Sequence, residues 1–238
     1  MTSTRFPGKV IADLCGEPML AREVARIRQA TRVDEVVVAT TTNRDDDAVV
    51  AVADACGARW FRGSEHDVLG RMASAAREAA ADLVVRVSGD CPLIDPTVID
   101  RAVEVLEKRG KELDFVTTEP PTTFPKGLDV EALYRDVLDR VDRMASSSAA
   151  REHVTFFIYE EAPTLFRCFT LVDDEDNSDQ RWTVDTIEDL QLVRTVFADL
   201  ELARANTSYK AILSYMRSRP ALRAINAHVV QRDPRSGA

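Results

Sequence analysis

The sequence lacks the features that mark secreted, membrane-spanning and nucleic-acid-binding proteins. Its four cysteines are scattered without a Cys-x-x-Cys pair, and its amino terminus has no apolar signal-peptide core. No apolar run approaches the roughly 18 residues that suggest a membrane span. The formal net charge is −9 and no basic stripe is present, so most of the surface would repel a polyanion. We therefore expect a soluble, cytoplasmic protein with neither nucleic acid nor membrane as a partner.

The composition is ordinary for a globular protein. Apolar residues make up 45% of the 238 positions and charged residues 30%, which leaves little room for long disorder. A chain of this length can form one large α/β domain with a substantial core. We expect a single domain over residues 1–238, ending in a polar, disordered tail at 231–238.

Apolar runs of strand length alternate with amphipathic stretches of helix length through the first half of the chain. The predicted strands span residues 35–40, 58–61, 83–87 and 113–117. The predicted helices span residues 18–30, 45–56, 67–80 and 96–108. This order is typical of a doubly wound α/β domain, with a mostly parallel sheet and helices on both faces.

The alternation is lost in residues 118–180 and returns near the carboxyl end. Turns, a helix at 134–144 and a strand at 166–172 are mixed in this region, which predicts a small irregular α+β lobe. We interpret the lobe as the part that carries the substrate or forms a dimer arm. Further core elements follow, namely a strand at 181–184 and helices at 187–198 and 208–217.

The loop at residues 3–9 is the first stretch that could carry chemistry. It reads Ser-Thr-Arg-Phe-Pro-Gly-Lys and so places a hydroxyl, a guanidinium and an ammonium on a turn-forming backbone. Such a loop can hold a triphosphate with its backbone amides and neutralise it with two cations. A solvated basic terminus is the alternative interpretation.

Two aspartates, Asp90 and Asp185, each follow a predicted apolar strand. Ligands of open α/β sheets collect at the carboxyl ends of the strands, where both carboxylates would lie. Magnesium prefers a few carboxylates together with substrate phosphates and water, so the pair could share one ion. Alone, either residue could instead cap a turn or the following helix.

Five motifs in this order resemble the cytidylyltransferase family, nearest its branch of spore coat polysaccharide biosynthesis proteins. Relatives of that branch make CMP-activated sialic acid and CMP-activated 3-deoxy-manno-octulosonate. The likeness covers nearly the whole chain. The motifs are the loop at 3–9, Leu-Cys-Gly-Glu-Pro-Met-Leu at 14–20, Phe-Arg-Gly-Ser-Glu at 61–65, Gly-Asp-Cys-Pro-Leu-Ile-Asp at 89–95 and Trp-Thr-Val-Asp-Thr at 182–186.

The resemblance implies a Rossmann-like nucleotidyltransferase fold that transfers CMP from CTP to an acidic sugar or related acceptor, with release of pyrophosphate. The product would serve surface polysaccharide or glycoconjugate synthesis. By this likeness Arg5 and Lys9 are catalytic and grip the triphosphate with Ser3, while Asp90 and Asp185 hold Mg²⁺. The residues implied near the base and ribose are Arg62, Gly63, Ser64, Asp67, Arg71, Arg86 and Ser88.

The likeness extends to residues 124–131 and 151–155 of the irregular lobe, which concentrate charge beside turns. It implies a homodimer formed through this lobe and an acceptor site there. An ordinary surface ion-pair cluster is the alternative for these charges. The implied acceptor-binding residues are Lys126, Asp129, Arg151 and His153.

One departure from the family opens two alternatives. Relatives begin with a buried strand and an Ala-Arg pair before the position of Met1, so the resemblance predicts a fold that lacks its first strand. A truncated, non-catalytic paralogue is therefore one alternative. A nucleotide-sugar-dependent glycosyltransferase is the other, with an acidic triad at 45–47 or 174–176, although both runs are typical of solvated loop or helix-start charge.

Overall fold

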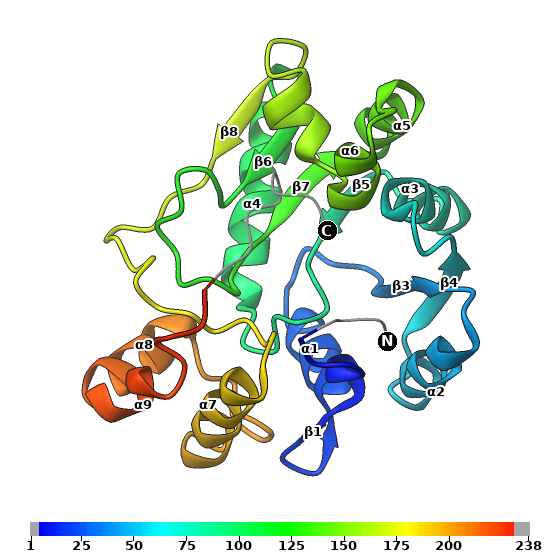
Figure 1. The fold of residues 1–238 in the computed structure, drawn as a ribbon. Coiled ribbons are helices and arrows are strands. Elements are labelled where there is room, and N and C mark those ends of the chain that lie inside the picture. The colour runs from blue at the N-terminus through cyan, green and yellow to red at the C-terminus, as the bar shows by residue number, and fades with distance from the viewer. Residues whose placement is uncertain (1–4, 231–238) are drawn as a thin grey trace.

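The computed structural model describes residues 5–230 of the chain. Ser3 and the expected tail at 231–238 therefore lie outside the described residues. The described part combines helices with two main β-sheets, as Figure 1 shows. The α/β class that the sequence predicts is confirmed.

The strands form a two-stranded parallel sheet and a four-stranded mixed sheet. The first pairs β3 (Val37–Thr41) with β4 (Arg59–Gly63). The second has the order β5-β7-β6-β8, in which β7 runs antiparallel to both of its neighbours. The parallel arrangement predicted for the sheet is thus found in the β3/β4 and β6/β8 pairs, whereas β7 enters from the lobe in the opposite direction. The bounds of this sheet are Leu83–Arg86 for β5, Phe115–Thr117 for β6, Glu131–Tyr134 for β7 and Cys168–Thr170 for β8.

No strand among residues 5–230 joins the two sheets. In that part of the chain β3 pairs only with β4, and β5 pairs only with β7. All four residues of β5 are half-buried although three of them are apolar. A short hairpin of β1 (Asp13–Leu14) and β2 (Glu17–Pro18) precedes the first helix.

The two helices that contribute the most residues to the main core have clear capping signals. Helix α4 (Pro96–Arg109) starts with a proline, and the Asp95 carboxylate accepts the Thr97 backbone N–H. Helix α7 (Ile187–Asp199) starts with a capping box between Thr186 and Asp189. The apolar faces of both helices contribute to one large cluster that also contains Trp182.

The other helices cover the sheets and the carboxyl-terminal side of the core. Helix α3 packs against β3 and β4 on one side and against α5 and α6 on the other (Figure 1). The helices are α1 (Met19–Ile27), α2 (Asp47–Ala55), α3 (Val68–Glu78), α5 (Arg135–Met144), α6 (Ser148–His153), α8 (Tyr209–Arg217) and α9 (Pro220–Ala224). Short helical segments are η1 (Lys9–Ile11), η2 (Arg44–Asp46), η3 (Gly110–Glu112) and η4 (Phe157–Glu161).

The segment 181–184 differs from the predicted strand. It makes a single parallel bridge, between Arg181 and Lys126, and the Trp182 N–H donates to the Lys126 carbonyl at 2.7 Å. Two residues later the Val184 N–H donates to the Asp90 carbonyl at 2.8 Å. Because its backbone groups pair with two different loops, the segment is extended without belonging to a sheet, and it ties those loops together.

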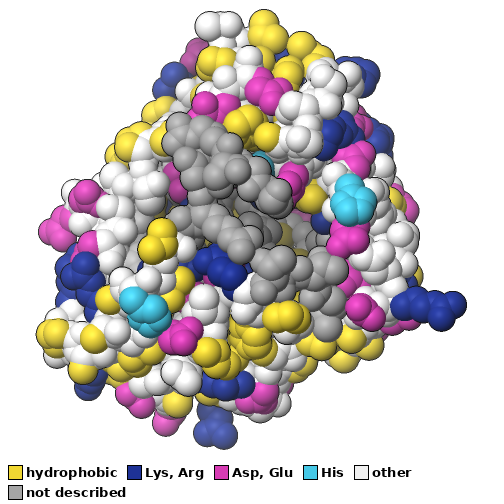
Figure 2. All heavy atoms as spheres, in the orientation of Figure 1, with side chains coloured by type: hydrophobic (Ala, Val, Ile, Leu, Met, Phe, Trp, Pro, Cys, Tyr) yellow, Lys and Arg dark blue, Asp and Glu magenta, His cyan; other side chains and the backbone are white. Residues whose placement is uncertain are grey.

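The surface carries both signs of charge. Figure 2 shows acidic and basic side chains interspersed over the described part of one face. Among the helices of residues 5–230, none combines the length and apolarity required to cross a membrane.

Removal of a core leucine tests the assigned core. Leu192 on α7 is 1% exposed, so we expect Leu192→Ala to lower the free energy of unfolding by about 2–5 kcal/mol. Leu165 is 54% exposed, and Leu165→Ala should cost less than about 1 kcal/mol. Urea denaturation of both variants gives the comparison. Equal losses in the two would contradict the assignment of α7 to the core.

Candidate active site

The site forms where three segments distant in sequence meet at one lysine. The Lys9 ammonium, on η1, donates to Asp90 Oδ2 at 2.7 Å and to Asp185 Oδ1 at 2.7 Å. Gly8, directly before η1, has a φ of 72°, a left-handed conformation that favours glycine and turns the chain into the site. The structure therefore brings together the two aspartates that the sequence analysis paired, with a cation between them.

Arginines complete the pairing of Asp185. Its second carboxylate oxygen, Oδ2, lies 2.8 Å from Arg5 Nη2 and 2.7 Å from Arg181 Nη2. Arg181 also donates to Asp189, whose carboxylate is fully buried. Asp189 in turn accepts the backbone N–H of Asp185 at 2.9 Å. The result is a chain of alternating charges that fixes the position of the Asp185 side chain.

Arg181 and Asp189 are absent from the predicted site residues. Their signal in the sequence is spacing, because Arg181, Asp185 and Asp189 follow one another at intervals of four residues. That spacing indicates neighbouring side chains only if the backbone is helical or tightly turned. Because the sequence predicts a strand at 181–184, the spacing does not stand out as a sign that these three residues are neighbours.

The backbone around the two aspartates is tightly packed. The Asp90 carbonyl accepts the Val184 N–H at 2.8 Å and the Thr183 hydroxyl at 3.2 Å. On the other side of this segment lies Gly127, with a φ of 107°. A Cβ atom at Gly127 would come within 2.8 Å of the Thr183 backbone nitrogen. The absence of a side chain at Gly127 therefore allows the lobe to lie directly against the site.

Glu23 is a buried acid next to this site that the sequence analysis did not select. Its side chain is 2% exposed, and its Oε2 atom has no hydrogen-bond partner among residues 5–230. Burial, helped by the charge of Asp90, raises the pKa of Glu23 well above its ordinary value, which favours the neutral carboxyl. The sequence signal is an acid on the apolar stripe of α1, four residues after Met19 and one before Val24.

Electrostatics favour the charged form of the central lysine and of Asp185. Burial lowers the pKa of Lys9, but the Asp90 and Asp185 carboxylates outweigh it and hold that pKa above its ordinary value. Burial raises the pKa of Asp185, while the hydrogen bonds from Lys9 and Arg181 and the charge of Arg5 bring it below its ordinary value. The Lys9–Asp185 pair is therefore ionised at neutral pH.

The donor set of Asp90 and Asp185 fits a divalent metal ion such as Mg²⁺. Both groups are hard carboxylate oxygens, and the Lys9 ammonium already stands between them as a cation. In the part of the chain that the structure describes, no group of three or more His, Cys, Asp or Glu side chains is arranged to hold a metal. The remaining ligands would therefore come from substrate phosphates and water.

The residues predicted near the base and ribose gather at the carboxyl ends of β3 and β4. Arg62 donates to the carbonyls of Thr41 and Asn43 at 2.8 and 2.6 Å. Arg71 donates to the carbonyl of Ser64. Gly63 pairs with Thr41 in the sheet, and Asp67 caps α3 by accepting the Gly70 N–H. These side chains and backbone groups form one wall at the carboxyl ends of β3 and β4.

Two further cations lie beside carboxylates, one at the end of β5 and one in the lobe. Arg86, at the end of β5, donates to Glu131 on β7 at 2.7 Å, and Ser88 lies in the loop that follows. Lys126 lies 2.8 Å from Glu119 and 3.1 Å from Asp129. Burial raises the pKa of Asp129 to about 6 despite its pairing with Lys126.

Arg151 and His153 lie apart from Lys126. Arg151 donates to both oxygens of Asp67, at 2.7 and 2.6 Å, and to Asp142 at 3.0 Å, so it ties α6 to α3 and α5. His153 ends α6, with its ring 6.3 Å from that of Phe156. The structure thus separates the four predicted acceptor-binding residues into two groups.

The acidic runs considered for a glycosyltransferase have other contacts. Asp46 is 3% exposed and accepts the hydroxyls of Thr40 and Thr41 at the end of β3. Asp174 pairs with Lys210 at the surface, 2.8 Å away, and Asp176 accepts the Ser178 N–H. Asp174 and Asp176 are thus engaged away from the site, and Asp46 closes a turn.

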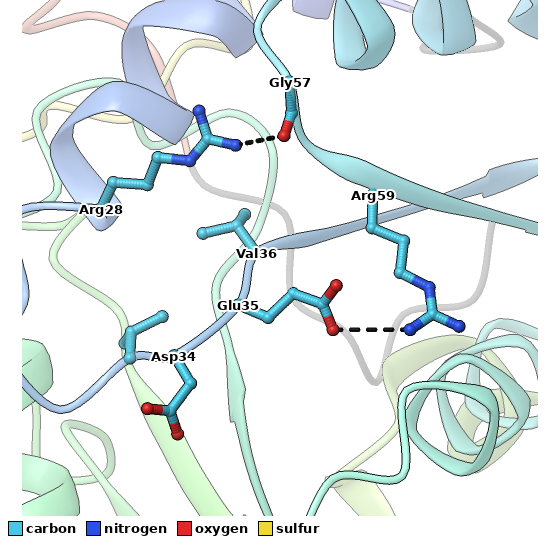
Figure 3. Close-up of a pocket in the computed structure, with 7 residues that line it drawn as sticks. Arg28, Asp34, Glu35, Val36, Gly57 and Arg59 are labelled. Carbon is cyan, nitrogen blue, oxygen red and sulfur yellow. Dashed lines mark hydrogen bonds and ion pairs between the residues drawn. The ribbon is translucent and has the colours of Figure 1, made fainter.

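A hollow lies at the amino ends of β3 and β4, opposite the carboxyl ends that form the wall (Figure 3). Its two arginines are already engaged. Arg28 donates to the Gly57 carbonyl at 2.6 Å, and Arg59 faces Glu35 at 3.5 Å. Its position, away from the carboxyl ends of the strands, separates this hollow from the candidate active site.

Comparisons with known proteins identify the family and the fold. A family model described as cytidylyltransferase matches residues 1–212. Spore coat polysaccharide biosynthesis protein SpsF of Bacillus subtilis is 30% identical over 83% of this chain and 82% of its own. The 3-deoxy-manno-octulosonate cytidylyltransferase of Geobacter sulfurreducens is 42% identical over 44% of this chain and 41% of its own. A cytidylyltransferase structure from Leptospira borgpetersenii superimposes with a TM-score of 0.90 at 29% identity, over 98% of this chain and 95% of that one.

The ion pairs of Arg151 predict how the stability of the protein depends on pH. The hydrogen bonds from Arg151 lower the pKa of Asp67 below its ordinary 3.8. Their contribution to the free energy of unfolding is therefore complete above pH 3.8, and it is lost as the pH falls through the lower pKa of the folded state. Arg151→Met should cost about 1 kcal/mol at pH 7, and the cost should shrink below about pH 4.

Urea denaturation across pH 3 to 7 measures this difference. Arg143→Met removes an exposed arginine from the end of α5 and is the matched control, which should show no such trend. A cost for Arg151→Met that is the same at every pH would contradict the assigned ion pairs.

Proposed function

Because the chain belongs to the cytidylyltransferase family, we propose that it transfers CMP from CTP to an acidic sugar or related acceptor and releases pyrophosphate. The observation that carries this proposal is the convergence of Asp90 and Asp185 on Lys9, with Arg5 beside them. Carboxylates that can hold a metal next to two cations that can hold phosphates are what phosphoryl-group transfer requires.

The proposed reaction is an in-line displacement at the α-phosphorus of CTP. An acceptor hydroxyl gives up its proton to water while its oxygen forms the new bond to phosphorus. The bond to the bridging oxygen of the β-phosphate breaks, and pyrophosphate leaves with those electrons. Lys9 and Arg5 would donate to the phosphate oxygens and neutralise the charge that develops on the leaving group. When bound by Asp90 and Asp185, Mg²⁺ would add charge neutralisation at the same phosphates.

The cytidine and the acceptor would occupy opposite sides of this centre. We propose that the wall formed by Arg62, Gly63, Ser64, Asp67 and Arg71 receives the base and ribose. Its place at the carboxyl ends of β3 and β4 supports this, since nucleotides bind at that edge of such sheets. We propose that Arg86, at the end of β5, and Ser88, in the loop that follows, also bind the nucleotide near the base and ribose.

The acceptor would approach from the lobe, where Lys126 and Asp129 lie beside the segment that leads to Asp185. The names of two relatives, one in spore coat polysaccharide biosynthesis and one a 3-deoxy-manno-octulosonate cytidylyltransferase, support an acidic sugar for a surface polysaccharide. We further propose that the enzyme works in the cytoplasm as a homodimer formed through this lobe.

Pyrophosphate release with CTP, Mg²⁺ and a panel of acidic sugars tests the function. Asp90→Asn and Asp185→Asn should each lower metal-dependent turnover by at least about 100-fold, because each removes half of the charge that holds the metal. Asp174→Asn is the matched control, since Asp174 is exposed and pairs only with Lys210 among the contacts described. It should retain full activity.

The rival glycosyltransferase is distinguished by ligand-dependent thermal stabilisation. A chain of the proposed function should be stabilised by CTP with Mg²⁺ and not by UDP-sugars. Stabilisation by UDP-sugars alone would contradict the proposal, and so would turnover that survives both Asp→Asn substitutions.

A further inference from the structure

We propose that the Lys9 ammonium and the divalent metal ion occupy the same position between Asp90 and Asp185, so that metal binding depends on nucleotide binding. This inference rests on the proposed function and concerns how the same site is loaded. It is carried by the place of the Lys9 Nζ atom, which lies 2.7 Å from one oxygen of each carboxylate.

The distances exclude joint occupancy. Magnesium binds carboxylate oxygens at roughly 2.0–2.1 Å, so an ion held by the same two oxygens would overlap the ammonium or lie in contact with it. Two cations at such a separation repel strongly, and the half-buried site screens them poorly. One of the two must leave before the other can bind.

The negative charges of Asp90 and Asp185 are already balanced by Lys9 and the two arginines, without a metal. Asp185 already has Lys9 on one oxygen, and Arg5 and Arg181 on the other. The Asp90 side chain has Lys9 at 2.7 Å on Oδ2, while within the described part of the chain its Oδ1 accepts only the weak Cys91 thiol contact at 3.5 Å. A metal arriving alone would have to displace this cation from both carboxylates.

A triphosphate removes this obstacle. It brings several negative charges to the amino-terminal loop, where the Lys9 ammonium, on a flexible four-carbon stem, can exchange its carboxylates for phosphate oxygens. The vacated carboxylates then need a cation, and the same phosphates supply the remaining ligands for it. Nucleotide and metal should therefore bind with strong positive coupling.

Binding of Mn²⁺, measured by electron paramagnetic resonance, tests the inference without any turnover. Wild-type protein should bind Mn²⁺ weakly in the absence of nucleotide, and Lys9→Met should bind it at least about tenfold more tightly, since the competing cation is gone. Lys210→Met, which removes an exposed lysine paired with Asp174, should match the wild type. Adding Asp90→Asn to Lys9→Met should abolish the gain.

A second measurement uses the intact wild-type protein, in case the Lys9 variant does not fold. Equilibrium dialysis of CTP with and without Mn²⁺ should show that the metal strengthens nucleotide binding by about tenfold or more. Tight Mn²⁺ binding by the wild type alone, or no gain in a folded Lys9→Met protein, would overturn the inference. Either result would leave the proposed function standing if pyrophosphate release still depends on CTP and metal, so the two can fail separately.

Discussion

The structure of the site depends on one ammonium group held between two carboxylates. Asp90 and Asp185 lie 95 positions apart in the sequence, and without Lys9 their like charges would repel in a half-buried setting. The same lysine lies on the amino-terminal loop and so draws a third segment to this edge of the fold. Charge pairing therefore helps to assemble the three segments into one site.

Beyond Lys9 and the two aspartates, the network of paired charges extends into the core. Asp189 is fully buried at the start of α7, where it caps the helix and also holds Arg181. The helix start and the site thus share one carboxylate, and a change in the cap would be felt at Asp185. Because a buried charge that loses its partner is costly, each member of this chain constrains the next.

The alternation of apolar runs and amphipathic stretches predicted the α/β class and most helices, and a polar residue after an apolar run indicated Asp90 and Asp185. These are local patterns. The antiparallel course of β7 and the division into two sheets are pairings between distant segments, which no local period records. Glu23 is missing from the predicted site residues for a related reason. A carboxyl on the apolar face of a helix can be recognised as part of a site only when the loop that packs over it is known.

Gly127 shows how little freedom the contact between lobe and site leaves. A methyl group there would meet the backbone of residues 182 and 183 at 2.8–2.9 Å, where no side-chain rotamer change can make room. In a saturation-mutagenesis library, position 127 should therefore tolerate glycine alone, although it touches no substrate in the proposed reaction. Selection at position 127 would preserve the path of the main chain. It would be as strict as selection on a residue that takes part in the reaction.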